Sequence, residues 1–266
     1  MARPASLLSI LIALAACASQ GPSGIPTGRV IDLTHPFDVA AVYWPTAEGF
    51  VLETEFQGMV EHGYYYESHR FRASEHGGTH LDAPIHFAEG RQTVDEIPLE
   101  RLMGPARVVD VSSAAEKDPD YAITRDDLER FEAEHGRIPP GAVVLLRTGF
   151  SERWPDRARY LGTEERGPDA VARLHFPGLH PDAARWLLSE RDIAAVGLDT
   201  ASIDPGESTL FESHRVLLAG NVPVFENVAH LGELPPSGAY VIALPMKIGG
   251  GSGAPLRIIA LLPQPQ

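Results

Sequence analysis

Short apolar runs rich in valine and isoleucine recur along most of the chain, and glycine or proline stands at the ends of several of them. Runs of this length and composition predict buried β-strands. The first lies at the start of 28–37, and the others occupy 106–112, 141–150, 193–204, 222–228, 240–248 and 256–262.

Helical periodicity lies between some of these runs. In 124–136, TRDDLERFEAEHG, Thr124 is suited to cap the start of a helix and Gly136 to end it. In 180–192, HPDAARWLLSERD, Pro181 stands near the predicted start, and Ala184 and Leu187 share one face. Strands that alternate with helices predict an α/β fold with a mixed sheet, and we expect one domain over 29–266 because no repeat or linker follows residue 30.

The composition is that of a soluble globular protein, with 44% hydrophobic and 22% charged residues in a chain of 266. This length is enough for one large core. The net charge of −14 argues against nucleic acid as a partner, because phosphate binding needs a basic surface.

The first residues have the layout of a secretory signal. Arg3 precedes an apolar run from Leu7 to Ala16, which is shorter than a membrane span, and the only cysteine, Cys17, follows. Residues 14–17, LAAC, resemble a bacterial lipobox. We therefore expect a lipoprotein signal peptide at 1–16, a lipidated Cys17, a flexible tether at 17–28 and an exported, periplasmic or cell-envelope protein. The alternative is an ordinary cleaved signal peptide with an incidental cysteine.

The stretch EHGGTHLDAPIHF, residues 75–87, concentrates His76, His80, Asp82 and His86. The adjacent glycines and the following proline make a helix improbable. In an extended segment His76 and His80 would lie about 13 Å apart, at roughly 3.3 Å per residue. That is too far for one metal ion, so the chain must bend at the glycines.

Imidazole and carboxylate groups are ligands that zinc and manganese accept. His80 and Asp82 stand two positions apart and can face the same side of an extended segment. The residues thus favour a metal site over a chance pair of surface histidines.

The same stretch resembles the signature H-x-G-T-H-x-D-x-P-x-H-F of the metal-dependent cyclase/hydrolase family, which includes bacterial kynurenine formamidases and isatin hydrolases. Similarity continues in VIDLTHPF (30–37), YWPT (43–46), GLDTASID (197–204), 211–231 and 244–263, and thus covers about 29–263. The resemblance implies a swivelling β/β/α fold with a mixed sheet, and assembly as a homo-oligomer, a dimer or tetramer.

The resemblance also implies a metal-ligand set. His76, His80 and Asp82 would hold one divalent ion, and Asp82 would bridge to a second ion bound by His214 and Glu226. Glu226 stands in an apolar strand, where an unpaired carboxylate would be costly and a metal would compensate it. His214 has the alternative of being a loop histidine.

Two further roles follow from the resemblance. His86 matches the histidine that the family uses as proton donor and acceptor, and Trp44 matches an aromatic residue that packs on substrate; for Trp44, ordinary core packing is the alternative.

Four nearby residues are weaker candidates. Asp199, Ser202 and Asp204 could orient ligands or only shape the turn after their strand. His175 could line the pocket, although packing is the simpler interpretation.

These residues predict a metal-dependent hydrolase that cleaves an amide carbon–nitrogen bond of a small aromatic substrate. Zn²⁺ is expected first and Mn²⁺ second, as one or two ions. An arylformamidase that converts N-formylkynurenine to kynurenine and formate is the first expectation, and opening of a cyclic amide, as in isatin hydrolase, is the alternative. A lipid-anchored protein that binds small molecules or metal without turnover is a third. Export of the chain departs from intracellular tryptophan breakdown and weakens the first expectation.

Overall fold

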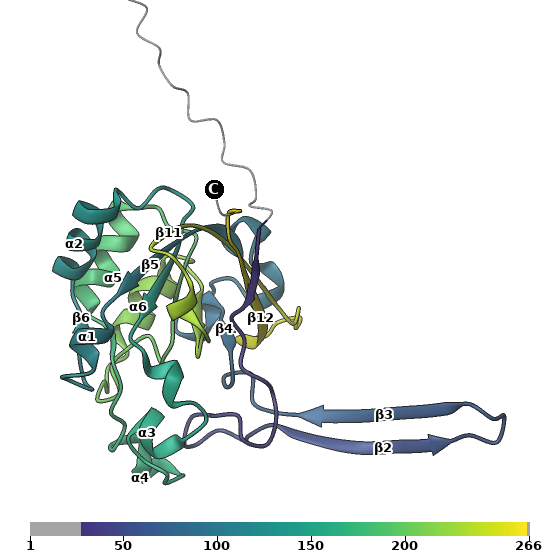
Figure 1. Ribbon diagram of the computed structural model, residues 1–266. Coiled ribbons are helices and arrows are strands. Elements are labelled where there is room, and N and C mark those ends of the chain that lie inside the picture. Colours follow the sequence, from purple (N-terminus) through teal and green to yellow (C-terminus); the bar gives the residue numbers. More distant parts are fainter. Residues whose placement is uncertain (1–27, 265–266) are drawn as a thin grey trace, which may run out of the picture.

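The computed structural model describes residues 28–264 and shows one α/β domain around a mixed eight-stranded sheet (Figure 1). The strands lie in the order β1-β12-β11-β5-β7-β9-β10-β4, and β4 also pairs with β12, which closes the sheet into a barrel-like core. Their bounds are β1 Val30–Asp32, β4 His80–Asp82, β5 Met103–Asp110, β7 Val143–Arg147, β9 Ala195–Leu198, β10 Val224–Glu226, β11 Ser237–Pro245 and β12 Gly253–Leu261. The expected fold class is confirmed, and each predicted apolar run contains or overlaps one of these strands.

The central strands are parallel and apolar on both faces. β5, β7, β9 and β10 pair in parallel, whereas β1, β11, β12 and β4 pair antiparallel. Along β7, Val143 and Leu145 belong to the core inside the barrel, and Val144 and Leu146 belong to the core beneath the helices. A strand covered on both faces needs apolar residues at every position, which explains the unbroken runs.

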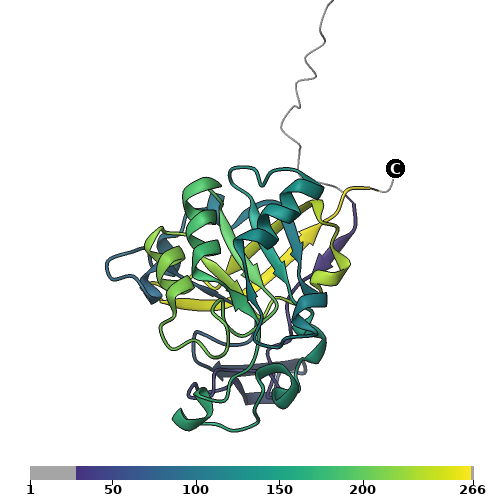
Figure 2. The ribbon, with the colours of Figure 1, turned by 90° about the vertical axis from the view of Figure 1, so that its left-hand side faces the viewer.

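Helices cover the outer face of these central strands (Figure 2). The two predicted helices are α2, Arg125–His135, and α5, Pro181–Glu190. Thr124 caps α2 by accepting a hydrogen bond from the Asp127 amide, and Gly136 ends it with φ of 84°. A third helix that the sequence pattern did not predict, α6, Glu212–Ala219, packs beside α5.

The remaining elements are short. They are the helices α1 Ser112–Ala115, α3 Arg157–Leu161 and α4 Pro168–Val171, the paired strands β6 Ala122–Ile123 and β8 Gly178–Leu179, and 3-10 turns, of which η1, Pro84–His86, lies at the site.

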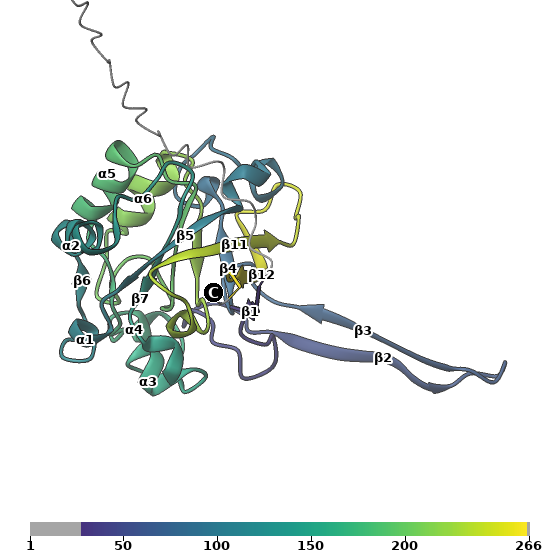
Figure 3. The ribbon, with the colours of Figure 1, turned by 45° about the horizontal axis from the view of Figure 1, so that its top comes forward.

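A long hairpin, β2 Val51–Met59 and β3 Tyr65–Arg72, projects from the body of the molecule (Figures 1 and 3). The apolar pattern did not predict these strands. Both faces of the hairpin are largely exposed, so no alternation between apolar and polar positions marks it.

The predicted signal peptide at 1–16, and the predicted tether at 17–28 except for Gly28, lie outside the described residues. Within 28–264, none of the helices combines the length and the hydrophobicity that a membrane crossing requires.

Candidate metal centre

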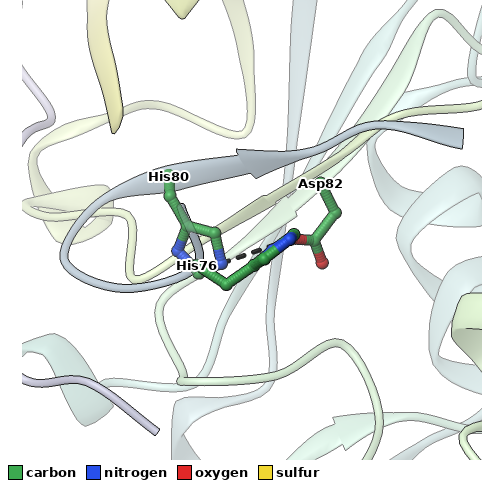
Figure 4. A group of neighbouring side chains, drawn as sticks. All are labelled: His76, His80 and Asp82. Carbon is green, nitrogen blue, oxygen red and sulfur yellow. Dashed lines mark hydrogen bonds and ion pairs between the residues drawn. The ribbon is translucent and has the colours of Figure 1, made fainter. Parts of the chain in front are cut away.

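Two paired strands bring the first candidate ligands together. β4 carries His80 and Asp82, and β10, its antiparallel neighbour, places Glu226 opposite His80. His80 and Asp82 are two positions apart, so their side chains leave the same face of β4, where His76 meets them (Figure 4). His214 reaches the same point from α6.

The loop before β4 makes the predicted bend. Gly78 has φ of +59°, in the left-handed region that favours glycine. A side chain on Gly77 would overlap the ring of Tyr43, so this glycine is also required by close packing. The bend brings the rings of His76 and His80 to a centroid separation of 5.5 Å.

The five candidate ligands form two groups that share one carboxylate. Asp82 Oδ1 lies 2.6 Å from Nδ1 of His76 and 3.3 Å from Nε2 of His80. Its other oxygen, Oδ2, lies 3.1 Å from Nε2 of His214. Glu226 also faces both groups, because its oxygens lie 3.2 Å from the same nitrogen of His214 and 3.5 Å from Nε2 of His80.

These separations suit a metal centre. Ligand atoms bound tetrahedrally at about 2.0–2.2 Å from an ion stand about 3.3–3.6 Å from one another. Four of the five separations are close to this range, and the fifth, between His76 and Asp82, is a hydrogen-bond distance. The donors are imidazole nitrogens and carboxylate oxygens, which zinc and manganese both accept. Asp82 and Glu226 are almost fully buried, at 1% and 3% exposure, and buried carboxylates require compensating positive charge. The residues therefore fit a divalent ion.

The pKa values of the Asp82 and Glu226 carboxyls are shifted in opposite directions. Burial alone would raise the pKa of Asp82, but the charge of His76 and hydrogen bonds from His214 and His76 lower it well below its usual range. The pKa of Glu226 is raised by burial and by the neighbouring charge of Asp82. Two acids this close favour a cation between them.

The pKa values of two candidate ligand histidines, His80 and His214, are raised. Burial alone would lower the pKa of His214, but hydrogen bonds to Asp204, Asp82 and Glu226 raise it well above its usual value. The pKa of His80 is likewise raised, because its interactions with Asp82 and Glu226 outweigh burial.

Each of the three ligand imidazoles has a partner for its other ring nitrogen. Nδ1 of His214 lies 2.6 Å from Asp204, and Nδ1 of His80 lies 3.0 Å from the carbonyl oxygen of Gly78. Nε2 of His76 lies 2.9 Å from the hydroxyl of Ser252. Such partners fix the tautomer and the ring orientation of a ligand histidine.

Two of the weaker candidates from the sequence, Asp204 and Ser202, lie at the site. Asp204 contacts His214, whereas the Asp199 carboxylate accepts hydrogen bonds from Thr148 and Gly149. Ser202 lines the pocket, and its hydroxyl accepts a hydrogen bond from the Asp204 amide.

His175 is not a pocket residue. Its imidazole lies on the surface, 45% exposed, and pairs with Asp120 at 2.9 Å. Its neighbour Phe176 is fully buried and packs edge-on against Trp44.

A cavity of about 300 Å³ opens above the ligands. Trp44, Phe87 and Phe211 form an aromatic wall, in which Phe211 packs 6.3 Å from Trp44 and 5.4 Å from Phe87 between ring centroids. The sequence pattern pointed to Trp44 alone. Phe87 ends the histidine-rich motif, but Phe211 stands before a helix that had not been predicted. The side chains that line this cavity include no lysine or arginine.

His86 lies in this cavity on η1 and belongs to neither ligand group. Its ring stacks on that of His76, with centroids 3.8 Å apart. Burial is the main cause that lowers the pKa of His86 to about 4, so its imidazole is neutral near pH 7 and can accept a proton.

Comparisons with known proteins identify relatives of this chain. The cyclase family model matches residues 31–205. The isatin hydrolase of Roseibium aggregatum is 37% identical over 198 residues, which are 71% of this chain and 73% of that protein. The kynurenine formamidase of Salinibacter ruber is 33% identical over 235 residues, 86% of this chain and 96% of that protein.

Solved structures show the same relation. Isatin hydrolase A from Ralstonia solanacearum has a TM-score of 0.78 and 34% sequence identity, over 88% of this chain and 92% of that one. The chain therefore belongs to the cyclase family of metal-dependent hydrolases.

Proposed function

We propose that this hydrolase cleaves the amide carbon–nitrogen bond of a small, flat aromatic substrate in the cavity above the candidate metal ligands. The observation that carries the proposal is the position of the buried ligand cluster, which lies directly beneath the aromatic wall of Trp44, Phe87 and Phe211.

His76, His80, Asp82, His214 and Glu226 would hold the metal. We propose two ions, because Asp82 and Glu226 each present one oxygen to either side of the cluster. Zn²⁺ is the first expectation for these nitrogen and oxygen donors and Mn²⁺ the second. When bound, a divalent ion acts as a Lewis acid toward the amide carbonyl and as an activator of water.

The chain itself supplies proton transfer and orientation. Neutral His86 accepts a proton from the attacking water and delivers it to the leaving nitrogen as the carbon–nitrogen bond breaks. The products are a carboxylic acid and an amine. The aromatic wall holds the ring of the substrate with its amide facing the ligand cluster.

The cavity favours an uncharged cyclic amide. N-formylkynurenine carries an amino acid group whose carboxylate calls for a cationic partner, and the cavity lining includes no lysine or arginine to pair with it. Isatin has no such group. Arylformamidase activity remains the second candidate, because kynurenine formamidases match this chain over nearly their full length.

A substrate panel tests this order of preference. With Zn²⁺ or Mn²⁺ supplied, we expect kcat/KM to be highest for isatin and related uncharged ring amides and lower for N-formylkynurenine. An N-formyl aniline without the amino acid group separates the effect of charge from that of ring opening. Preference for N-formylkynurenine over all of these would contradict the argument from charge, and no hydrolysis of any of them would contradict the proposed function.

Two single variants should distinguish a metal ligand from the residue that transfers protons. Asp82→Ala should lose most of the bound metal, whereas His86→Ala should keep it and lose about 10²–10⁴ in kcat/KM, the usual contribution of general acid–base catalysis. His135→Ala removes a surface histidine at the end of α2 that belongs to none of the groups of possible metal ligands, and it serves as the control. Elemental analysis and kinetics on the same preparations measure both properties. Full metal content in Asp82→Ala, or full activity in His86→Ala, would refute the corresponding assignment.

We also propose that the protein is a homo-oligomer and that the β2–β3 hairpin contacts a second copy. An isolated two-stranded hairpin is marginally stable in water. On one face of this hairpin Leu52, Met59, Tyr65 and Phe71 are 51–66% exposed. The base of the hairpin lies next to the site, because Ser74, two residues after β3, lines the cavity. A second copy bound at this base would therefore lie beside the cavity.

The double variant Leu52→Asp/Phe71→Asp should reduce the oligomer to a monomer, since it places charge on the face that would be buried. Leu99→Asp is the matched control, because Leu99 is similarly exposed, at 58%, outside the hairpin. Light scattering coupled to gel filtration measures the mass. A monomeric wild type, or an unchanged mass in the double variant, would disprove the role of the hairpin.

Finally, we propose that Cys17 is lipidated and anchors the protein in the cell envelope. The support is the apolar run that ends in LAAC and the lack of a second cysteine. Expressed with residues 1–266 in a bacterial host, the wild type should fractionate with membranes and Cys17→Ala should not. Equal membrane association of the two would exclude the anchor.

A further inference from the structure

Asn227 lies directly after the candidate ligand Glu226, at the end of β10. It is buried, at 2% exposure, and its backbone is in the left-handed region, with φ of 54°. A non-glycine residue in this conformation is uncommon, and asparagine is among the types that adopt it most readily. The side chain lines the cavity, but the proposed reaction gives it no role.

The hydrogen bonds of Asn227 converge on the bend that precedes β4. Its Nδ2 donates to the carbonyl oxygen of Gly78 at 2.7 Å, and its own carbonyl oxygen accepts from the hydroxyl of Thr79 at 2.7 Å. Its Oδ1 lies 2.8 Å from the hydroxyl of Tyr160, which is fully buried. One side chain therefore joins α3, through Tyr160, to the bend.

The chemistry of these partners sets the orientation of the amide. The Gly78 carbonyl can only accept, so the NH₂ group of Asn227 must face it. Oδ1 of Asn227 then faces Tyr160, and the Tyr160 hydroxyl must donate to it. Without that hydroxyl, Oδ1 would be buried with no donor, and the amide would lose the group that holds its orientation.

The same Gly78 carbonyl lies 3.0 Å from Nδ1 of His80. When Nδ1 of His80 donates there, Nε2 keeps its lone pair and points toward Asp82 and Glu226, at 3.3 and 3.5 Å. Glycine has no side chain to restrict its backbone, so hydrogen bonds must help to hold this carbonyl in place.

We propose that Asn227, oriented by Tyr160, is a positioning residue for the candidate ligand His80. It fixes the Gly78 carbonyl, which in turn fixes the tautomer and the ring orientation of His80. This inference rests on the proposed metal centre and adds Asn227 and Tyr160 to it as residues that act on His80 through the Gly78 carbonyl.

The test uses three single variants of the full-length protein. Tyr160→Phe removes only the hydroxyl, and Asn227→Asp replaces the NH₂ group with an oxygen that repels the Gly78 carbonyl. Tyr121→Phe is the control, because it also removes a tyrosine hydroxyl bonded to a buried group, Asp127, on the helical face away from the site. The readouts are the affinity for Zn²⁺ and for Mn²⁺, by competition with a chelator, and the unfolding midpoint of the metal-free protein.

We expect Tyr160→Phe and Asn227→Asp to weaken metal affinity by about 10- to 100-fold, the usual effect of losing a group that orients a ligand. Tyr121→Phe should lower the unfolding midpoint and leave the affinity unchanged. Unchanged affinity in Tyr160→Phe, or an equal loss in Tyr121→Phe, would overturn the positioning role. A wild type that binds neither metal would instead overturn the metal centre on which the role depends.

Discussion

The rest of the site depends on the burial of carboxylates that need positive charge. Asp82, Glu226 and Asp204 are each no more than 3% exposed, and His80 and His214 lie among them. In the protein alone, these histidines are the nearest source of that charge. The surrounding carboxylates stabilise the protonated form of His214, which is why its pKa is raised. A divalent ion satisfies the same demand without protons, so one electrostatic constraint accounts for both the composition of the cluster and its affinity for metal.

β4, the strand that closes the barrel, holds the ligands in the positions that this constraint requires. β4 pairs with β10 on one side and with β12 on the other, so its three residues are held from both edges. The first pairing sets Glu226 opposite His80, and the second brings Ser252, just before β12, to His76. A ligand set built on a short strand is precise here because both of its neighbours fix its register.

The candidate metal ligands and the aromatic wall come from different parts of the fold. The candidate ligands come from β4 and the loop before it, from β10 and from α6. The aromatic wall comes from segments around them: Trp44 near the hairpin, Phe87 after η1, and Phe211 before α6. Segments outside regular elements tolerate change better than the sheet does. The aromatic wall can therefore change without disturbing the ligand cluster.

The sequence by itself determined what depends on local spacing and residue type. The apolar runs located seven of the eight strands of the sheet, all except β4. Thr124 and Gly136 marked the ends of α2, and the paired glycines predicted the bend between His76 and His80. Only the tertiary structure decided the β2–β3 hairpin, the aromatic wall at Phe211 and the link from Tyr160 through Asn227 to Gly78. The hairpin has no buried face to leave a pattern, and Asn227 meets Gly78 across 149 positions of the chain. Local periodicity reports which face of an element is buried, but it contains no information about which distant residue that face will meet.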